Sequence, residues 1–245
     1  MVCEIRSFIG TRSVQEDHAA FCENEKGLFA VVCDGIGSRA DGGSSSRLAA
    51  DRFIELFCNE YIKNFPAFIT DAAERIDAEV FENFGKNSGT AAVAAFITGN
   101  KLYWLSVGDC RIYIIRSGRI KQITTDHTYK YVLDLRRKNG IIDEHAYNRE
   151  IEKGGHLASF IGMGGIDIVD VSLAPLKLKS GDKILLVTDG LYKTLTEKSV
   201  YDIISSDKSA EIIADKLIDA VKRSEGSIDN TTLALIYFDV TEGKT

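Results

Sequence analysis

The sequence predicts an α+β fold in which antiparallel strands are covered by long helices. Two Gly-containing turns, at residues 98–101 and 116–119, each join two apolar, β-branched runs, as in β-hairpins. Long stretches elsewhere repeat apolar residues every three or four positions, which indicates amphipathic helices. Because consecutive hairpins give antiparallel neighbours, these patterns do not fit the parallel sheet of a Rossmann fold.

The expected strands are short apolar runs that end at turn residues. They cover residues 28–33, 91–98, 102–107, 112–116, 184–188 and 233–238. Three helices are expected between them. The first is capped by Ser44 or Ser45 and runs to about Asn64, the second covers about 66–84 with Gly85 as its C-cap, and the third covers about 210–223.

The chain is predicted to form a single domain over residues 1–245. Its 245 residues and 27.0 kDa suit one large domain, and no Ser/Pro-rich linker, repeat or low-complexity tract divides it. Residues from about 126 to 165 differ, because they are polar, contain several glycines and include few strand-like runs. We expect this segment to be a partly helical, flap-like insertion.

Charge and composition exclude several classes of protein. The net charge of −6 argues against nucleic acid as a partner, because nucleic-acid binding needs a basic face. No apolar run approaches the length of a membrane span, and the N-terminus lacks the apolar core of a signal peptide, so we expect no membrane association and a cytoplasmic location. The five cysteines form no Cys-x-x-Cys pair and are expected to be reduced thiols.

Carboxylates follow several of the predicted strands. Asp34-Gly35 and Asp189-Gly190 each come directly after a buried run. An Asp-Gly pair is commonly only a turn, but its repetition at two strand ends indicates a cation site, since Gly lets a ligand approach the backbone. Further acids at similar breaks are Glu16, Asp17, Asp109 and Asp229. An all-carboxylate set favours Mg²⁺ or Mn²⁺ over zinc.

Seven short motifs follow one another along almost the whole chain. They are RSVQED at 12–17, VCDGIG at 32–37, SGTA at 88–91, VGDCR at 107–111, TDHT at 125–128, GDKILLVTDG at 181–190 and DNTT at 229–232. Their order and spacing resemble the protein phosphatase 2C (PPM) family in its bacterial, single-domain form. Seven motifs in order are far more specific than any one of them.

The resemblance implies a fold, an activity and cofactors. The fold would be a four-layer α-β-β-α sandwich with two central antiparallel sheets flanked by helix pairs. The activity would be hydrolysis of phosphoserine and phosphothreonine in proteins, by direct attack of a metal-bridging water or hydroxide without a covalent intermediate. The cofactors would be two or three Mn²⁺ or Mg²⁺ ions, and the partners phosphorylated proteins modified by an opposing Ser/Thr kinase.

The resemblance also implies roles for the acids that match the family motifs. Asp34 would bridge two metal ions, and the carbonyl of Gly35 would bind the second ion. Asp189 and Asp229 would bind the first ion. Each of these positions carries the residue that the family motif requires.

The remaining site residues are implied in the same way. Glu16 and Asp17 would support the second ion, largely through water, and Asp109 would bind a third ion. Arg12 would hold the phosphate, because its planar guanidinium suits two phosphate oxygens. Asn230 would orient the carboxylates around it.

The chain departs from the family pattern at positions around these acids. Ile36 stands where some members have a histidine that acts as general acid, which leaves the source of that proton open. Ser38-Arg39 replaces a frequent Gly-His, Gly43 replaces a frequent acid, and Ser159 replaces the usual arginine. These changes leave the metal carboxylates intact and affect substrate recognition.

Other functions fit parts of the sequence. Cys33 and Arg39 have the spacing of a cysteine-based phosphatase loop, although Asp34 beside the thiol would repel both a thiolate and a phosphate. A pseudophosphatase that only binds phosphoproteins would normally lack a metal carboxylate, and Asp34, Asp189 and Asp229 are all present. A phosphodiesterase or another metal hydrolase is a further alternative.

Overall fold

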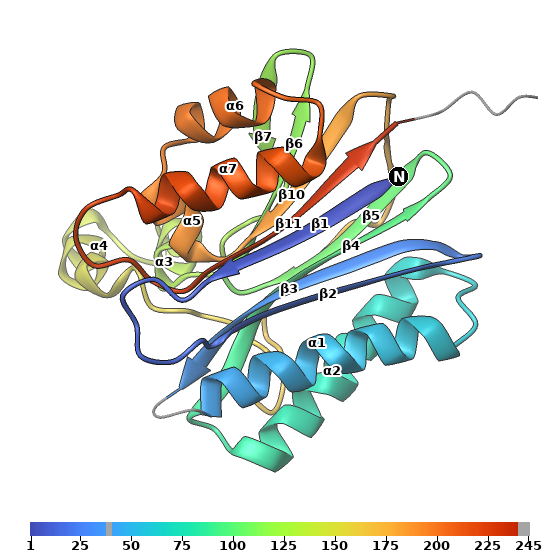
Figure 1. Ribbon diagram of the computed structural model, residues 1–245. Coiled ribbons are helices and arrows are strands. Elements are labelled where there is room, and N and C mark those ends of the chain that lie inside the picture. The colour runs from blue at the N-terminus through green and yellow to red at the C-terminus, as the bar shows by residue number, and fades with distance from the viewer. Residues whose placement is uncertain (38–40, 240–245) are drawn as a thin grey trace, which may run out of the picture.

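Two antiparallel sheets pack face to face between two layers of helices (Figure 1). The protein is described from a computed structural model that covers residues 1–37 and 41–239. In the first sheet the strand order is β1 (Val2–Phe8), β11 (Thr231–Phe238), β10 (Asp182–Val187), β6 (Arg111–Arg116) and β7 (Arg119–Gln122). The second sheet has the order β2 (Asp17–Asn24), β3 (Gly27–Gly37), β4 (Ser88–Thr98), β5 (Lys101–Val107) and β8 (Asp170–Val171), with β9 (Leu176–Lys177) also pairing with β5.

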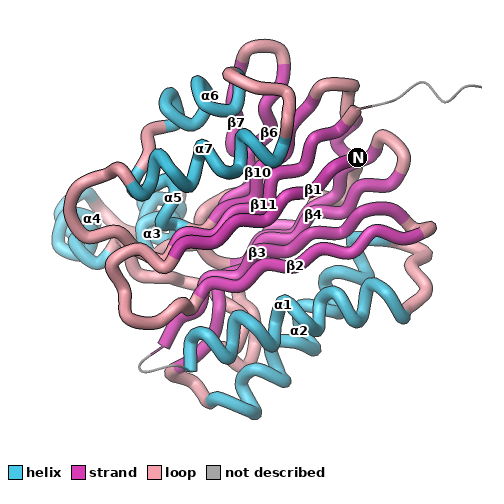
Figure 2. The backbone as a smooth tube through the Cα atoms, viewed as in Figure 1, coloured by secondary structure: helices cyan, strands magenta, loops and turns pink. Residues whose placement is uncertain are grey.

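The helices cover the outer faces of the two sheets (Figure 2). Those on the second sheet are α1 (Asp41–Asn59) and α2 (Phe65–Phe84). Those on the first sheet are α6 (Glu197–Ser205) and α7 (Ala210–Lys222), together with the short α5 (Asp189–Thr194). The predicted four-layer α-β-β-α sandwich is therefore confirmed.

Strand alternation explains the layering. In β3, Phe29, Val31 and Cys33 pack against the helices, whereas Ala30 and Val32 face the other sheet. Successive side chains of a strand point to opposite faces, so a strand covered on both sides reads as a continuous apolar run. The layer between the sheets takes buried residues from both of them, and the two sheets therefore share one core.

The predicted hairpins and the six predicted strands are present, but some boundaries differ. β3 does not end at Cys33, because residues 34–37 pair with the start of β4, which begins at Ser88. Cys33 is therefore not the last strand residue, and Asp34 lies within a strand. The first helix spans Asp41–Asn59 and does not reach Asn64.

The early end of α1 has a clear physical cause. The ammonium group of Lys26 donates to the carbonyl oxygens of Phe57, Cys58 and Glu60 at 2.6–2.9 Å. These bonds satisfy carbonyls that a longer helix would have used. Asn64 instead caps the next helix by accepting from the amide of Ala67.

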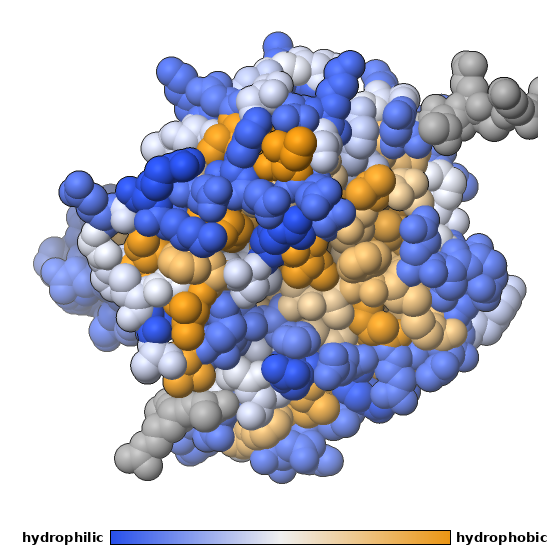
Figure 3. All heavy atoms as spheres, in the orientation of Figure 1, coloured by the Kyte–Doolittle hydropathy of each residue, from blue (hydrophilic) through white to orange (hydrophobic). Residues whose placement is uncertain are grey.

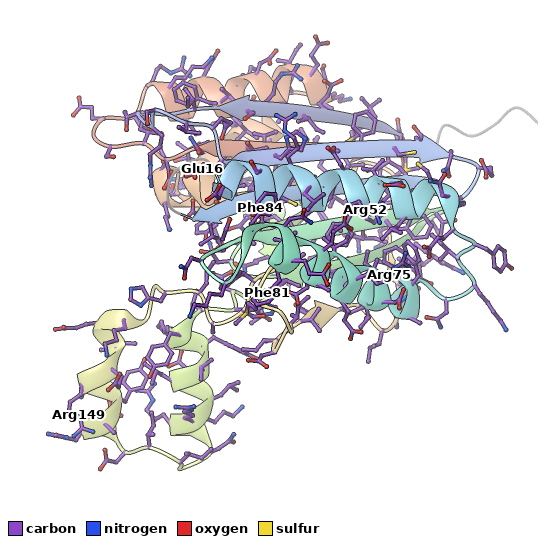
Figure 4. All side chains as sticks on the ribbon, turned by 90° about the horizontal axis from the view of Figure 1, so that it is seen from below. Glu16, Arg52, Arg75, Phe81, Phe84 and Arg149 are labelled. Atoms are coloured by element: carbon purple, nitrogen blue, oxygen red, sulfur yellow. The ribbon has the colours of Figure 1, made fainter. Side chains whose placement is uncertain are left out.

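The predicted insertion is partly helical, with α3 (Tyr129–Lys138), α4 (Glu144–Glu150) and a 3₁₀ turn at Ile151–Lys153. Figure 4 shows the two helices standing away from the sandwich, with Arg149 on the projecting α4. The chain returns to the body where Leu157 bridges to Thr128 and Ile161 bridges to Thr90. Within the 126–165 segment, the projecting part is therefore residues 129–156.

At one side of the sandwich the edge strands β1 and β2 lie next to each other. Figure 3 shows apolar surface between the two charged helix layers on this side. Val2 and Phe21 are among the exposed apolar side chains of these strands. Among the described residues, none of the helices combines the length and apolar character that crossing a membrane requires.

Candidate functional site

Five aspartates gather at one end of the layer between the sheets. Asp17 is the first residue of β2, and Asp34 pairs with it from β3. Asp109 follows the end of β5, Asp189 starts α5 two residues after the end of β10, and Asp229 comes just before β11. Because neighbouring antiparallel strands alternate in direction, the starts of some strands meet the ends of others at this edge.

Asp34 lies at the centre of this group. It follows Val32 by two residues, so its side chain lies on the face between the sheets, opposite to Cys33. Burial raises the pKa of Asp34 well above the usual value, and the negative charges of Asp17 and Asp189 raise it further. The repulsion indicates that the carboxylates lie close enough to one another for their charges to interact.

Asp17 links the two sheets. It is 6% exposed, and its Oδ2 accepts a hydrogen bond of 2.8 Å from the hydroxyl of Thr188, the residue after β10. Burial raises the pKa of Asp17 to about 7, although the bond from Thr188 acts in the opposite direction.

Two of the aspartates contact cationic side chains. A guanidinium nitrogen of Arg12 lies 2.6 Å from Oδ2 of Asp229, and the Arg12 side chain is 54% exposed. The ammonium of Lys193 donates to Asp189 one helical turn away. The structure thus places Arg12, the predicted phosphate ligand, against Asp229, and it adds Lys193, which was not predicted.

Asp109 is held by residues from the first sheet and α5. The hydroxyl of Tyr192 donates to the backbone carbonyl of Asp109 at 3.0 Å and lies 3.3 Å from Oδ2. The guanidinium of Arg111 lies 3.5 Å from the centre of the Tyr192 ring and forms a bidentate pair with Asp126. Burial, followed by the charge of Asp189, raises the pKa of Asp109 to about 6.

Asn230 fixes the loop that carries Arg12 and Glu16. Its side-chain amide donates to the carbonyls of Ile9 and Val14 at 2.8 and 3.0 Å, and its Oδ1 accepts from the amide of Glu16 at 2.8 Å. Its backbone N–H donates to Asp229. The hydrogen bonds of the side chain therefore hold the loop backbone.

Glu16 and Gly35 lie beside the start of α1, where Figure 4 labels Glu16. The amide of Gly35 donates to the carbonyl of Glu16 at 3.1 Å. A Cβ atom at Gly35 would lie 2.3 Å from the carbonyl oxygen of Gly42, so only glycine fits there. Burial raises the pKa of Glu16, and the guanidinium of Arg12 lowers it.

The positions that depart from the family pattern take other roles. Ser159 is buried, and its hydroxyl donates to the carbonyl of Ile168 at 2.8 Å, so it is a structural residue of its loop. Gly43 lies in the first turn of α1, and Ile36 pairs with Gly89 within β3 and β4. Ser38 and Arg39 lie outside the described residues.

The donor chemistry of this site fits divalent hard cations. Among residues 1–37 and 41–239, no three Asp, Glu, His or Cys side chains stand ready to hold a metal ion as arranged. Two candidate ligands, Asp189 and Asp229, instead hold Lys193 and Arg12. The aspartates nevertheless supply only oxygen donors and an excess of negative charge, which Mg²⁺ and Mn²⁺ match.

A family model described as protein phosphatase 2C matches residues 6–220. The chain belongs to the protein phosphatase 2C family. It is 27% identical over 241 residues to serine/threonine phosphatase stp of Listeria monocytogenes, covering 94% of this chain and 93% of that protein. It is 25% identical over 236 residues to protein phosphatase PhpP of Streptococcus pneumoniae, covering 92% of each.

Solved structures show the same fold. The serine/threonine phosphatase of S. agalactiae superposes with a TM-score of 0.81 at 23% identity, over 97% of this chain and 100% of that one. The catalytic domain of the serine/threonine phosphatase PstP, solved with two manganese ions, gives a TM-score of 0.73 at 23% identity, over 96% of both chains. These structures show that the chain has the family fold, and the family model and the curated relatives show that it is a protein phosphatase.

Sequence reasoning missed Tyr192, Lys193 and Thr188. Lys193 follows Asp189 by four residues, so an i,i+4 pair could have been predicted if the helix starting at Asp189 had been recognised. Tyr192 and Thr188 contact the site through tertiary packing, for which the sequence offers no comparable signal.

Proposed function

We propose that this protein hydrolyses phosphoserine and phosphothreonine in proteins with the help of two or three Mn²⁺ or Mg²⁺ ions. The observation that carries the proposal is the gathering of five aspartates from different strands at one edge of the sandwich, in the order of the family motifs. Burial raises the pKa values of Asp17, Asp34 and Asp109, and the negative charges of neighbouring aspartates raise them further, so divalent ions would relieve the repulsion.

Each acid keeps the role that its motif implies. Asp34 and the Gly35 carbonyl would hold the ions at the centre, with Asp189 and Asp229 on one side and Glu16 and Asp17 on the other. Asp109 would hold a third ion. When bound, such ions supply positive charge that polarises the phosphoryl group and lowers the pKa of water.

Arg12 is proposed to bind the phosphate of the substrate. Its exposed guanidinium is paired with Asp229, and a phosphate would offer the same planar fork two oxygens. Asn230 would keep the loop that carries Arg12 in place. Because Ile36 cannot give up a proton, the leaving serine or threonine oxygen is proposed to take its proton from solvent.

The named relatives support this proposal. The proteins of Listeria monocytogenes and Streptococcus pneumoniae are a serine/threonine phosphatase and a protein phosphatase, and the PstP domain was solved with manganese. Phosphorylated proteins are the corresponding substrates. A Ser/Thr kinase that supplies them, the absence of nucleic-acid and membrane partners, and a cytoplasmic location stay predictions.

Cysteine chemistry receives no support from the geometry of Cys33. The side chain is fully buried among the residues that face α1 and α2, and burial raises the pKa of its thiol. A nucleophilic cysteine needs a lowered pKa and access to substrate. The pseudophosphatase alternative predicts binding of a phosphopeptide without its turnover.

The test is release of phosphate from a phosphothreonine peptide in the presence of Mn²⁺. Asp34→Asn should lower kcat by about a hundredfold or more, since it removes a charge from the centre of the ligand set. Asp202→Asn is the matched control, because Asp202 is an exposed residue of α6. Equal activity of Asp34→Asn and the control would refute the proposal, and a wild-type protein that binds the peptide without turnover would establish the pseudophosphatase.

A further inference from the structure

The two sheets leave different edges at the two sides of the sandwich. β1 and β2 lie together at one side, whereas β7 is the outermost strand of the first sheet at the other. Within the part of the chain that the structure describes, no strand pairs with the outer edge of β7. An unpaired edge offers a row of backbone donors and acceptors to another extended chain.

The hairpin register identifies these free backbone groups. Arg119 pairs with Arg116 across a two-residue turn, Lys121 pairs with Ile114, and the amide of Ile123 donates to the carbonyl of Ile112 at 2.9 Å. In an antiparallel pair the residues that exchange hydrogen bonds alternate along the strand. The odd-numbered residues of β7 therefore bond to β6, and the N–H and C=O groups of residues 120 and 122 point outward.

A cavity adjoins this edge on the face between the sheets. Its volume is about 470 Å³, and Ile114, Ile123 and Leu176 supply apolar surface to it. The side chains of Arg119 and Lys121 also line it, as strand alternation requires. The cavity thus combines an apolar interior with a basic border, directly beside free backbone groups.

The charges of this border are available to a partner. Among the described residues, Arg119 and Lys121 take part in no salt bridge, whereas the neighbouring Arg116 is paired with Asp182. None of the residues that line the cavity is acidic. In a protein with a net charge of −6, two free cations beside an apolar cavity attract an acidic ligand and repel a basic one.

We propose that the outer edge of β7 docks an extended, acidic segment of a phosphoprotein substrate. The segment would add to the first sheet as a further strand, place one apolar side chain in the cavity, and set acidic residues against Arg119 and Lys121. Strand addition of this kind gains affinity from backbone hydrogen bonds and selectivity from alternate side chains. That the docked protein is a substrate rests on the proposed function, but the docking itself does not.

From the proposed docking edge, the chain of β7 runs toward the aspartates. The chain runs from Arg119, near the tip of the hairpin, to Asp126. Asp126 pairs with Arg111, which starts β6 and follows Asp109 by two residues. This end of the segment therefore lies close to the aspartates. The seven steps from residue 119 to residue 126 would span at most about 23 Å if the chain were fully extended. A docked segment would therefore lie several residues away from the phosphorylated residue, outside the catalytic residues themselves.

The test uses an unphosphorylated, fluorescently labelled peptide in which one leucine is flanked by glutamates. Anisotropy should show binding to the wild-type protein and at least about tenfold weaker binding to Arg119→Glu/Lys121→Glu. Lys63→Glu/Lys86→Glu makes the same change of charge at exposed positions beside the two ends of α2 and should bind like wild type. Equal weakening in both double variants, or no binding to the wild type, would overturn the proposal.

A second peptide tests strand addition separately from charge. It has the same side chains but N-methyl groups on all amides of the segment, so neither of its edges can donate hydrogen bonds to a strand. We expect it to bind at least about tenfold more weakly, and equal binding would overturn the strand-addition model. Turnover of an aryl phosphate with Mn²⁺ should be equal in all variants. A lack of turnover in the wild type would refute the proposed function while leaving the peptide result intact.

Discussion

A buried carboxylate in α2 anchors the loop of residues 162–165. Asp77 is 2% exposed, and it accepts backbone hydrogen bonds from Gly162 at 2.7 Å, Met163 at 2.8 Å and Gly165 at 2.6 Å. The first two reach Oδ1 and the third reaches Oδ2. Hydrogen bonds to a charged group contribute about 1.5–3 kcal/mol each, so this carboxylate should matter strongly for stability.

The two oxygens of Asp77 give a graded prediction. Asp77→Asn can keep its carbonyl oxygen at the Oδ1 position, but its NH₂ group would then face the N–H of Gly165. We expect a loss of roughly 2 kcal/mol in the free energy of unfolding, for one broken bond and one unpaired donor. Asp77→Ala loses all three bonds, and we expect a loss of roughly 3–5 kcal/mol.

The assay is urea unfolding followed by circular dichroism, with the slope of the transition as a check on two-state behaviour. Asp71→Ala is the matched control, because Asp71 is an exposed carboxylate on the same helix and should stay within about 0.5 kcal/mol of wild type. The reasoning is refuted if Asp77→Ala is as stable as this control, or if Asp77→Asn costs more than Asp77→Ala.

The same anchor should affect turnover. The loop continues into Ile161, whose backbone pairs with Thr90, and the Thr90 hydroxyl donates to the carbonyl of Asp34 at 2.8 Å. Loosening the loop in Asp77→Asn should therefore lower kcat at a temperature where the variant is still fully folded. An unchanged kcat would show that the loop does not position the Asp34 strand.

Three further predictions concern the thiols and the buried acids. Cys33→Ser should keep kcat within a few-fold of wild type, because the side chain at position 33 faces the helices. Asp34→Asn should be nearly inactive. A Cys33→Ser variant that is folded but inactive would contradict the metal-based account. Without divalent ions, the melting temperature should fall by several degrees as pH rises from about 4 to about 7, because the folded state keeps a proton at Asp17 that the unfolded chain releases over this range. Excess Mn²⁺ should remove this pH dependence. A melting temperature that does not change with pH in the absence of divalent ions would contradict the prediction. Diamide should oxidise Cys22 and Cys58 to a disulfide, because their sulfur atoms lie 2.9 Å apart, while the buried Cys33 stays reduced. Peptide mass mapping would show both results. Free thiols at Cys22 and Cys58 after treatment would contradict the pairing.

Local chemistry determined which parts of the fold could be predicted. The turns at 98–101 and 116–119 were predictable because glycine accepts the positive φ that tight hairpins need, and Gly99 and Gly118 do have positive φ. The strands β1 and β2 were not predicted. They are edge strands with polar and half-exposed residues, so their pattern is weak, and their pairing with β11 and β3 defines them.

The site was predictable only in part. Motif order predicted the five aspartates as site residues, and the structure brings them together at one end of the sandwich. The extension of β3 through Asp34 depends on its partner β4, which the local sequence does not reveal. The contacts of Tyr192 with Asp109, and of Asp77 with its loop, join residues more than eighty positions apart and follow from packing alone.

The central claim is that the aspartates act through divalent ions. It is tested most directly by measuring Mn²⁺ binding by calorimetry and phosphothreonine-peptide hydrolysis on the same exhaustively chelated preparation. The account predicts no hydrolysis without added ion, recovery that follows occupancy as Mn²⁺ is titrated in, and loss of both binding and hydrolysis in Asp34→Asn. Full hydrolysis after chelation, or unchanged Mn²⁺ binding in Asp34→Asn, would contradict it.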